Sequence, residues 1–310
     1  MHVAVVMPAR NEEALIASSI TSVPDLVQCL IVVDDGSTDS TSSIANEYLQ
    51  KLSSTKSMIT KLVTGNGEGV GSAILLGISE LYDMVENHEE WAVVIMAGDG
   101  QMDPNDLDHL LSGLDYADHV KGNRFQHHSG IQNMPKIRRI ASKTIGYLTS
   151  LATGWNWGDP QCGYTVTRLS LLSKHPRLYK WQGYGYPNWW ALCFSESSEL
   201  VTEVPVRSVY GNEKSGIRIL TFLPRVSLML FIGTWRRGWN WYIRGKGKRS
   251  APIPLRISVS SFWFISWIML IASMVDYRFI FGSFSLFNIV RYLDKNEQKK
   301  RSRPSTGFEM

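Results

Sequence analysis

The chain has 310 residues, of which 44% are hydrophobic, so a largely disordered protein is excluded and one core with an appendage, or two small domains, can form. Its three cysteines, Cys29, Cys162 and Cys193, lack the spacing of a disulfide framework or a zinc site and favour a reducing, cytosol-facing compartment. The net charge of +4 is unevenly distributed, because ten basic residues and no acidic ones lie between Lys214 and Arg256. No signal peptide is expected at the N-terminus.

Strand and helix patterns alternate from the first residue to about residue 125. Apolar β-branched runs predict strands at 3–8, 29–35, 58–65 and 91–99. Helical patterns follow at 11–20, 36–52 and 70–82, and Asp103-Pro104 has the residue types that begin a helix. This alternation predicts an α/β fold with a doubly wound, mostly parallel sheet, flanking helices, and ligands at the carboxyl ends of the strands.

Polar clusters fall at three of those strand ends. They occupy residues 8–12 (PARNE), 34–37 (DDGS) and 99–101 (DGQ). One such cluster alone is typical of loops and helix caps, whereas three in register favour a shared site.

The residue types in these clusters suit a metal and a nucleotide. Asp99 and Gln101 are two residues apart and can both face one hard divalent cation, which also takes phosphate oxygens and water as ligands. Asp103 is expected to cap its helix instead. Glu12 and the acids at 34–35 are expected to face ribose hydroxyls and base donors. The phosphate charge would be met by the metal and by basic side chains: Arg124, the nearest, and Arg138, Arg139, Arg207 and Lys214.

Two further stretches complete the predicted catalytic domain, residues 1–213. The glycine-rich turn at 65–78 matches neither a dinucleotide fingerprint nor a P-loop, and is expected to let a helix begin close to the rim of the sheet. Residues 126–213 are less regular, and the alternation at 199–210 suits an edge strand. This stretch is expected to form the acceptor side of the pocket, with Asp159 as a candidate base if the acceptor is a hydroxyl.

The last hundred residues predict contact with a membrane. Residues 214–250 mix apolar and basic residues with Trp235, Trp239 and Trp241, as amphipathic interfacial helices do. Within a predicted membrane segment at 251–293, residues 257–275 carry no charge over 19 positions, roughly 28 Å of helix. Basic residues flank both ends, which favours a hairpin over a single span, and residues 294–310 are expected to form a disordered basic tail.

Seven stretches, in their order and spacing, resemble glycosyltransferase family 2, and within it the polyprenyl-phosphate sugar transferases related to dolichol-phosphate mannosyltransferase. They are VVMPARNEEALI, VVDDGSTDST, GNGEGVGSAILLGI, MAGDGQMDP, KGNRF, DPQCGYTV and VPVRSVYGNEKSGI. The resemblance implies a GT-A (Rossmann-like) fold, a nucleotide-diphosphate sugar donor, Mg²⁺ or Mn²⁺, a polyprenyl phosphate acceptor at the cytoplasmic membrane face, and inversion at the anomeric carbon. No nucleic-acid partner is expected, and the oligomeric state is left open.

By position, the resemblance assigns several roles. Pro8, Arg10, Glu12 and Asp35 match residues that line the nucleotide. Asp99 and Gln101 match the metal motif, and Arg124 matches an arginine near the phosphates.

The chain departs from the family pattern at two positions. Ala97 stands where the metal motif usually has its first acid, and Arg10 stands where an aromatic residue is frequent. Two alternatives therefore stay open. One is an acceptor hydroxyl on a glycan or glycolipid, which would make Asp159 or Glu213 indispensable, and the other is a catalytically silent, nucleotide-binding membrane subunit.

Overall fold

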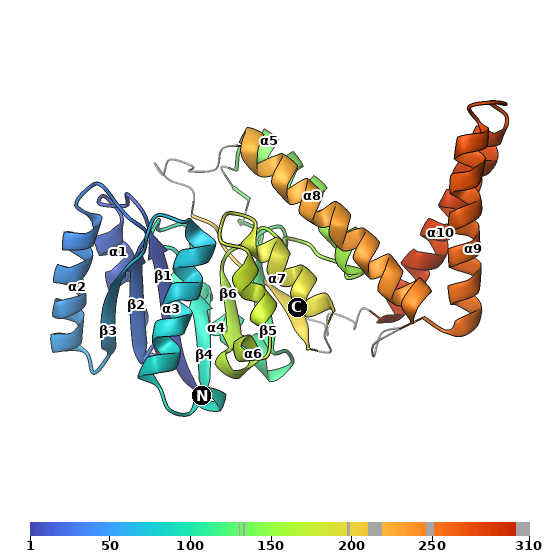
Figure 1. Ribbon diagram of the computed structural model, residues 1–310. Helices are drawn as coiled ribbons and strands as arrows, with labels where there is room; N and C mark the ends of the chain where they lie inside the picture. Colours follow the sequence, from blue (N-terminus) through green and yellow to red (C-terminus); the bar gives the residue numbers. More distant parts are fainter. Residues whose placement is uncertain (130, 133, 197–198, 210–218, 246–250, 302–310) are drawn as a thin grey trace.

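The computed structural model describes residues 1–129, 131–132, 134–196, 199–209, 219–245 and 251–301. It shows a globular α/β body from which a pair of helices projects (Figure 1). Two residues with predicted roles, Glu213 and Lys214, lie outside the described residues.

The described part of the body contains a seven-stranded sheet in the order β3-β2-β1-β4-β6-β5-β7. Only β6 runs antiparallel to its neighbours, and β7 forms an edge, so the predicted mostly parallel sheet and edge strand are confirmed. The strands are β1 (His2–Ala9), β2 (Cys29–Asp34), β3 (Ile59–Thr64), β4 (Trp91–Ile95), β5 (His119–Asn123), β6 (Thr165–Arg168) and β7 (Val201–Pro205).

Helices cover both faces of the sheet, because side chains alternate along its buried strands. On β1, Val5 and Met7 face one core, and Ala4 and Val6 face the other. The first core is covered by α1 (Ile16–Thr21), α2 (Thr41–Thr55) and α4 (Leu107–Ser112). The second is covered by α3 (Val70–Met84), α6 (Leu169–Ser173) and α7 (Tyr186–Ser195).

Short 3₁₀ turns connect some of these elements. They are η1 (His88–Glu90), η2 (Pro104–Asp106), η3 (Gly113–Asp115) and η4 (Pro176–Lys180). The predicted cap before η2 is confirmed, since Asp103 Oδ1 accepts the Asn105 N–H at 3.0 Å.

The structure corrects two sequence predictions in the body. Helix α1 begins at Ile16 rather than near residue 11, because residues 10–13 form a turn in which Asn11 has φ 55° and its side chain accepts the Thr38 N–H at 2.8 Å. The stretch described as less regular contains α5 (Lys136–Thr153), an amphipathic helix, and the almost wholly buried α7. Helix α7 lacks a polar face, so its sequence has no helical periodicity.

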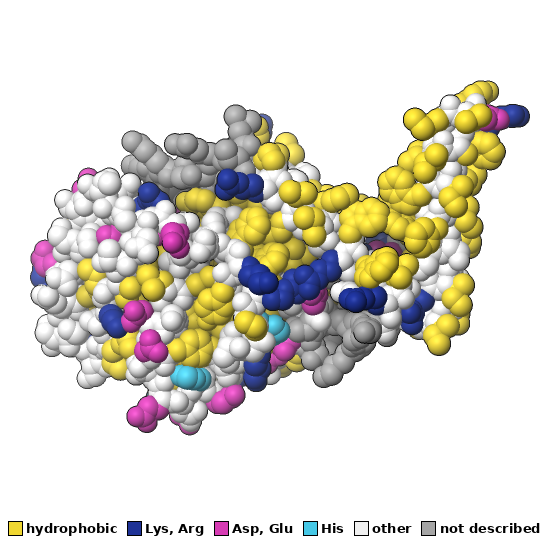
Figure 2. All heavy atoms as spheres, viewed as in Figure 1, with side chains coloured by type: hydrophobic (Ala, Val, Ile, Leu, Met, Phe, Trp, Pro, Cys, Tyr) yellow, Lys and Arg dark blue, Asp and Glu magenta, His cyan; other side chains and the backbone are white. Residues whose placement is uncertain are grey.

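Helix α8 (Ile219–Gly238) packs against α5 and α7 and continues into a π-helical turn, η5 (Trp239–Arg244). Val226 and Leu230 are buried in that contact, whereas Leu228 and Phe231 on the opposite face are about 60% exposed. Apolar side chains also cover the projecting helices (Figure 2).

The projecting pair is a helical hairpin formed by α9 (Ile253–Ala272) and α10 (Phe279–Arg301). The two helices pack closely at Gly282, where the side chain of Met269 occupies the space that a Cβ would take. Among the described residues, α9 is the one helix long and apolar enough to cross a membrane.

A buried ion pair joins this hairpin to the body and corrects two further predictions. Arg237 forms two hydrogen bonds with Asp294, at 2.7 and 2.8 Å, and Tyr242 donates to the same carboxylate at 2.7 Å. Trp241 is also buried here, so part of the Trp- and Arg-rich segment forms an internal joint instead of an interfacial surface. For the same reason, residues 294–301 continue α10 and are not a disordered tail. Residues 302–310 lie outside the described residues.

Candidate active site

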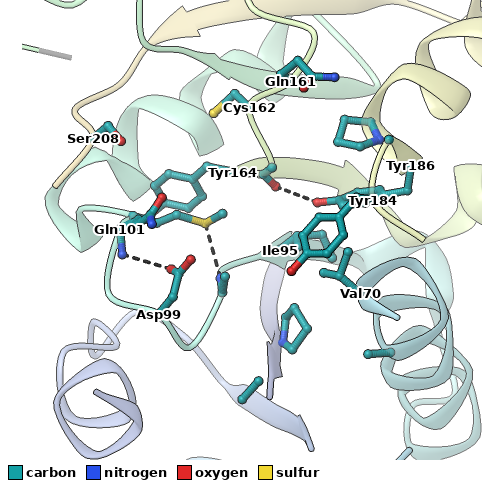
Figure 3. A pocket seen from close by; sticks show the side chains of 18 of the residues that line it. Val70, Ile95, Asp99, Gln101, Gln161, Cys162, Tyr164, Tyr184, Tyr186 and Ser208 are labelled. Carbon is teal, nitrogen blue, oxygen red and sulfur yellow. Dashed lines mark hydrogen bonds between the residues drawn. The ribbon is translucent and has the colours of Figure 1, made fainter. Parts of the chain in front are cut away.

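A cavity of about 270 Å³ lies at the carboxyl ends of β1, β2 and β4 (Figure 3). It brings together most of the residues singled out from the sequence: Pro8, Arg10, Glu12, Asp35, Asp99, Gln101, Arg124, Arg138 and Arg207. Arg139 is exposed on α5 and is not among the residues that line the cavity.

The loop after β4 presents alternate residues to the cavity. Ala97, Asp99 and Gln101 line it, whereas Gly98 is held from behind through a 3.0 Å hydrogen bond to the Pro8 carbonyl oxygen. Asp99 Oδ1 accepts the Gln101 N–H at 3.1 Å, which closes a tight turn through Gly100 at φ 70° (Figure 3). This turn orients the Asp99 carboxylate, and Gln101 lines the same cavity.

The glycine-rich turn holds Asp35. The two carboxylate oxygens of Asp35 accept the N–H groups of Gly67 and Gly69, at 3.0 and 2.8 Å. Both glycines have positive φ, 75° and 113°, which disfavours any residue with a side chain. Asp34 does not line the cavity, because it turns back to accept the Ser37 N–H at 3.0 Å.

Arg10 and Glu12 are placed by the turn after β1. The Glu12 N–H donates to Thr41 Oγ1 at 2.7 Å. Arg10 is about half exposed, donates to the Gly67 carbonyl oxygen at 3.3 Å and lies 3.9 Å from Asp35. A flat guanidinium group therefore borders the mouth of the cavity beside a buried carboxylate.

Arg124 is fixed by Asp159, which is fully buried. The guanidinium donates through Nε at 2.7 Å and through Nη2 at 3.0 Å to the two carboxylate oxygens. Asp159 is fixed in turn by Glu203, whose side chain accepts the Gly158 and Asp159 N–H groups at 2.8 and 2.9 Å.

Sequence reasoning missed Glu203 and Lys121, the other two charges of this buried group. Lys121 donates to the carbonyl oxygen of Cys162, and burial lowers its pKa. Burial raises the pKa of the Glu203 carboxyl group. The strands HVKGN and VTEVP each contain one charged residue. This pattern was the sequence signal that could have identified Lys121 and Glu203 as buried charged residues.

Three tyrosines also line the cavity and were missed: Tyr164, which precedes β6 beside the end of β4, and Tyr184 and Tyr186, which lie around the start of α7 (Figure 3). Burial raises the pKa of Tyr184, and the charges of Asp99 and Glu12 raise it further. Tyr186 donates to the Gly163 carbonyl oxygen at 3.2 Å.

The remaining basic candidates differ in their surroundings. Arg138 lines the cavity from the first turn of α5. Arg207 also lines it, but its guanidinium donates to Asp103 at 3.2 Å and is partly neutralised.

A wider hollow of about 940 Å³ adjoins the cavity and shares Arg10, Gly69, Tyr184 and Phe222 with it. Its wall includes the apolar α8 residues Leu228 and Ile232. Basic side chains border the hollow as well: Arg177, Lys180, Arg225 and Arg236.

Solved structures with a similar fold include glucosyl-3-phosphoglycerate synthase from Mycobacterium tuberculosis. Its complex with uridine-diphosphate is 21% identical, with a TM-score of 0.53 over 76% of this chain and 79% of that chain. Its complex with Mn²⁺, uridine-diphosphate and phosphoglyceric acid gives a TM-score of 0.51 at 21% identity, over 76% and 78% of the two chains. The fold is therefore that of the GT-A glycosyltransferases.

Residues 4–175, more than half of the chain, match the family model Glycosyl transferase family 2. The protein belongs to this family and is a nucleotide-sugar glycosyltransferase. UDP-N-acetylglucosamine--dolichyl-phosphate N-acetylglucosaminyltransferase of Methanococcus voltae is 24% identical over 220 residues, 66% of this chain and 84% of that protein. Polyprenol monophosphomannose synthase of Mycolicibacterium smegmatis is 29% identical over 146 residues, 47% of this chain and 52% of that protein.

Proposed function

We propose that the protein transfers a sugar from a nucleotide-diphosphate sugar to a polyprenyl phosphate at the cytoplasmic face of a membrane, with inversion at the anomeric carbon. The observation that carries this proposal is the position of the cavity, which adjoins a hollow walled by the exposed apolar side of α8. Relatives named for dolichyl-phosphate and polyprenol products support the choice of acceptor.

The donor occupies the strand ends in this proposal. Asp35 faces the base and Glu12 the ribose, while Arg10 stacks on the base and Pro8 forms the floor. The carboxylate of Asp35 is oriented before the donor arrives, because its oxygens are held by backbone N–H groups.

The oxygen donors of Asp99 and Gln101 fit a divalent cation such as Mg²⁺ or Mn²⁺. When bound, this cation stabilises the charge that develops on the leaving diphosphate. Arg124 would donate hydrogen bonds to the same group from a fixed position, because Asp159 holds its guanidinium in place while partly offsetting its charge.

The acceptor phosphate is anionic at neutral pH and can attack the anomeric carbon without a general base. Arg138 and Arg207, which line the cavity wall, would bind it, and the further candidates are Arg139, outside the cavity lining, and Lys214, outside the described residues. Asp159 is unsuited to act as a base toward a hydroxyl acceptor, because it is fully buried and both of its oxygens contact Arg124. This geometry favours the phosphate acceptor over the hydroxyl alternative.

The domain division follows from the same proposal. Residues 1–213 form the catalytic domain, 214–250 the interfacial segment apart from its buried joint at Arg237, Trp241 and Tyr242, and 251–293 the membrane segment. Exposed apolar residues on α8 and the hairpin would enter the lipid, and basic side chains bordering the hollow would meet anionic headgroups (Figure 2).

The direct test incubates the purified full-length protein in detergent with a panel of UDP- and GDP-sugars, Mg²⁺ or Mn²⁺, and a polyprenyl phosphate. Labelled sugar should move into the organic phase with one donor, and its anomeric configuration, read by NMR, should be inverted. Sugar transfer to a glycan hydroxyl, with no transfer to polyprenyl phosphate, would contradict the proposed acceptor. Nucleotide binding with no transfer from any donor would support the silent subunit.

A further inference from the structure

We propose that Ala97 makes cation binding conditional on the donor, so that the divalent cation and the nucleoside diphosphate enter the site as one unit. This inference rests on the proposed function and concerns how that site is loaded. It starts from the residue that departs from the family's acidic pattern.

Position 97 faces the place where the cation is expected. Ala97, Asp99 and Gln101 alternate along one loop and line the same cavity. The Ala97 N–H donates to Met102 Sδ at 3.3 Å, and the adjacent Gly98 carbonyl oxygen accepts the Ser19 hydroxyl at 3.0 Å, so the backbone of the loop is anchored. A carboxylate at position 97 would therefore share the cavity with Asp99, whereas the methyl group of alanine offers no ligand.

Three neighbouring acids are already engaged, and Glu12, which also lines the cavity, is assigned to the ribose of the donor. Asp35 is engaged by two backbone N–H groups, Asp103 caps η2 and pairs with Arg207, and Asp159 pairs with Arg124. Across the described ranges, nowhere do three His, Cys, Asp or Glu side chains converge as a metal site. The loop thus offers one carboxylate and one neutral amide.

One carboxylate compensates only part of the charge of a divalent cation, and Mg²⁺ surrenders its water reluctantly. The diphosphate of the donor brings the additional negative oxygens. The cation and the nucleoside diphosphate must therefore strengthen each other's binding to the protein. By linkage, each raises the affinity of the protein for the other by the same factor.

The test measures Mn²⁺ binding to the full-length protein in detergent, from the EPR signal of free Mn²⁺, with and without UDP or GDP. In the wild type, the nucleotide that binds should raise Mn²⁺ affinity by about tenfold or more. Ala97→Asp should raise the affinity for Mn²⁺ alone by about tenfold or more, because a second carboxylate faces the ion, and should reduce the effect of the nucleotide.

Ala97→Asn is the matched control, with nearly the same size as Ala97→Asp and no charge, and its Mn²⁺ affinity without nucleotide should rise much less than that of Ala97→Asp, because an amide oxygen is a weaker ligand than a carboxylate. Thermal unfolding of each variant checks that it folds. The inference is overturned if nucleotide leaves wild-type Mn²⁺ affinity unchanged, or if a folded Ala97→Asp variant binds Mn²⁺ no better than Ala97→Asn. Failure of both nucleotides to bind, with or without Mn²⁺, contradicts the proposed function itself.

Discussion

The two sides of the cavity are built differently. On the side of β1, β2 and β4, functional side chains are held by backbone groups of adjacent loops, as Gly67 and Gly69 hold Asp35. On the other side, Arg124 is held by the side chain of Asp159, and Tyr164 and Tyr186 are buried, whereas Tyr184 is 46% exposed. The strand-end side thus depends on backbone N–H groups of loops that the parallel strands bring to one edge, whereas the opposite side depends on side-chain pairing and on α8.

The largest expected effect is on the strand-end side. Asp99→Ala should lower turnover by about 1,000-fold or more, because it removes the one carboxylate of the metal motif. Asp108→Ala, an exposed aspartate on α4, is the matched control and should retain wild-type turnover. Sugar transfer in detergent measures both, and wild-type rates in Asp99→Ala would contradict the assignment.

The joint between the body and the hairpin should be the next most sensitive feature. Arg237→Met leaves Asp294 buried without its ion-pair partner, and breaking such a pair costs about 3–5 kcal/mol. The double variant Arg237→Met/Asp294→Leu should recover most of that loss, because neither charge remains buried. Thermal unfolding measures both, and equal stability of the single and double variants would contradict a coupled pair.

Acid should weaken the packing of β5 against α7. Burial, with a smaller contribution from the charge of Lys121, lowers the pKa of His119 from 6.5 to about 3. Below pH 6.5 the unfolded chain binds a proton at this histidine and the folded chain does not. The free energy of unfolding therefore decreases as the pH falls below 6.5. Between pH 6.5 and 5 the loss is about 2 kcal/mol.

The control for this prediction is His119→Gln, which cannot titrate and can still bond to Thr167. Its stability should fall less than that of the wild type between pH 6.5 and 5, as measured by urea unfolding. Parallel pH dependence in the two proteins would rule out His119 as the source.

The mutation with the smallest expected effect tests the acceptor side of the cavity. Arg138→Gln should raise the KM for polyprenyl phosphate by about tenfold, because it removes a positive charge that lines the cavity. Arg139→Gln makes the same change one residue away, outside the cavity lining, and should have less than about a twofold effect. Equal effects of the two variants would favour a general surface attraction over a phosphate site.

Local patterns were sufficient to predict the strand-end side. Apolar β-branched runs mark β1 to β4, and parallel strands bring their carboxyl ends to one edge, so Glu12, Asp35 and Asp99 could be placed together. The glycine turn was located, but its role in holding Asp35 depends on a hydrogen bond between two loops that no sequence pattern shows.

The opposite side could not be predicted in the same way. Arg124 was identified, yet its pairing with Asp159 spans 35 positions, and Glu203 comes from a still later strand. Helix α7 carries apolar residues on all faces and so lacks a periodic signal. The extension of α10 beyond residue 293 follows from the ion pair with Arg237, which charge composition alone does not reveal.

The hairpin leaves the body after η5 and returns to it at Asp294, beside Arg237 and Tyr242. Its departure and return points are therefore the same place on the protein surface. A helical hairpin joined to the body in this way can insert into a bilayer from one side without any folded segment crossing the membrane. The joint of Arg237, Tyr242 and Asp294 would then keep the catalytic cavity at a constant distance from the lipid.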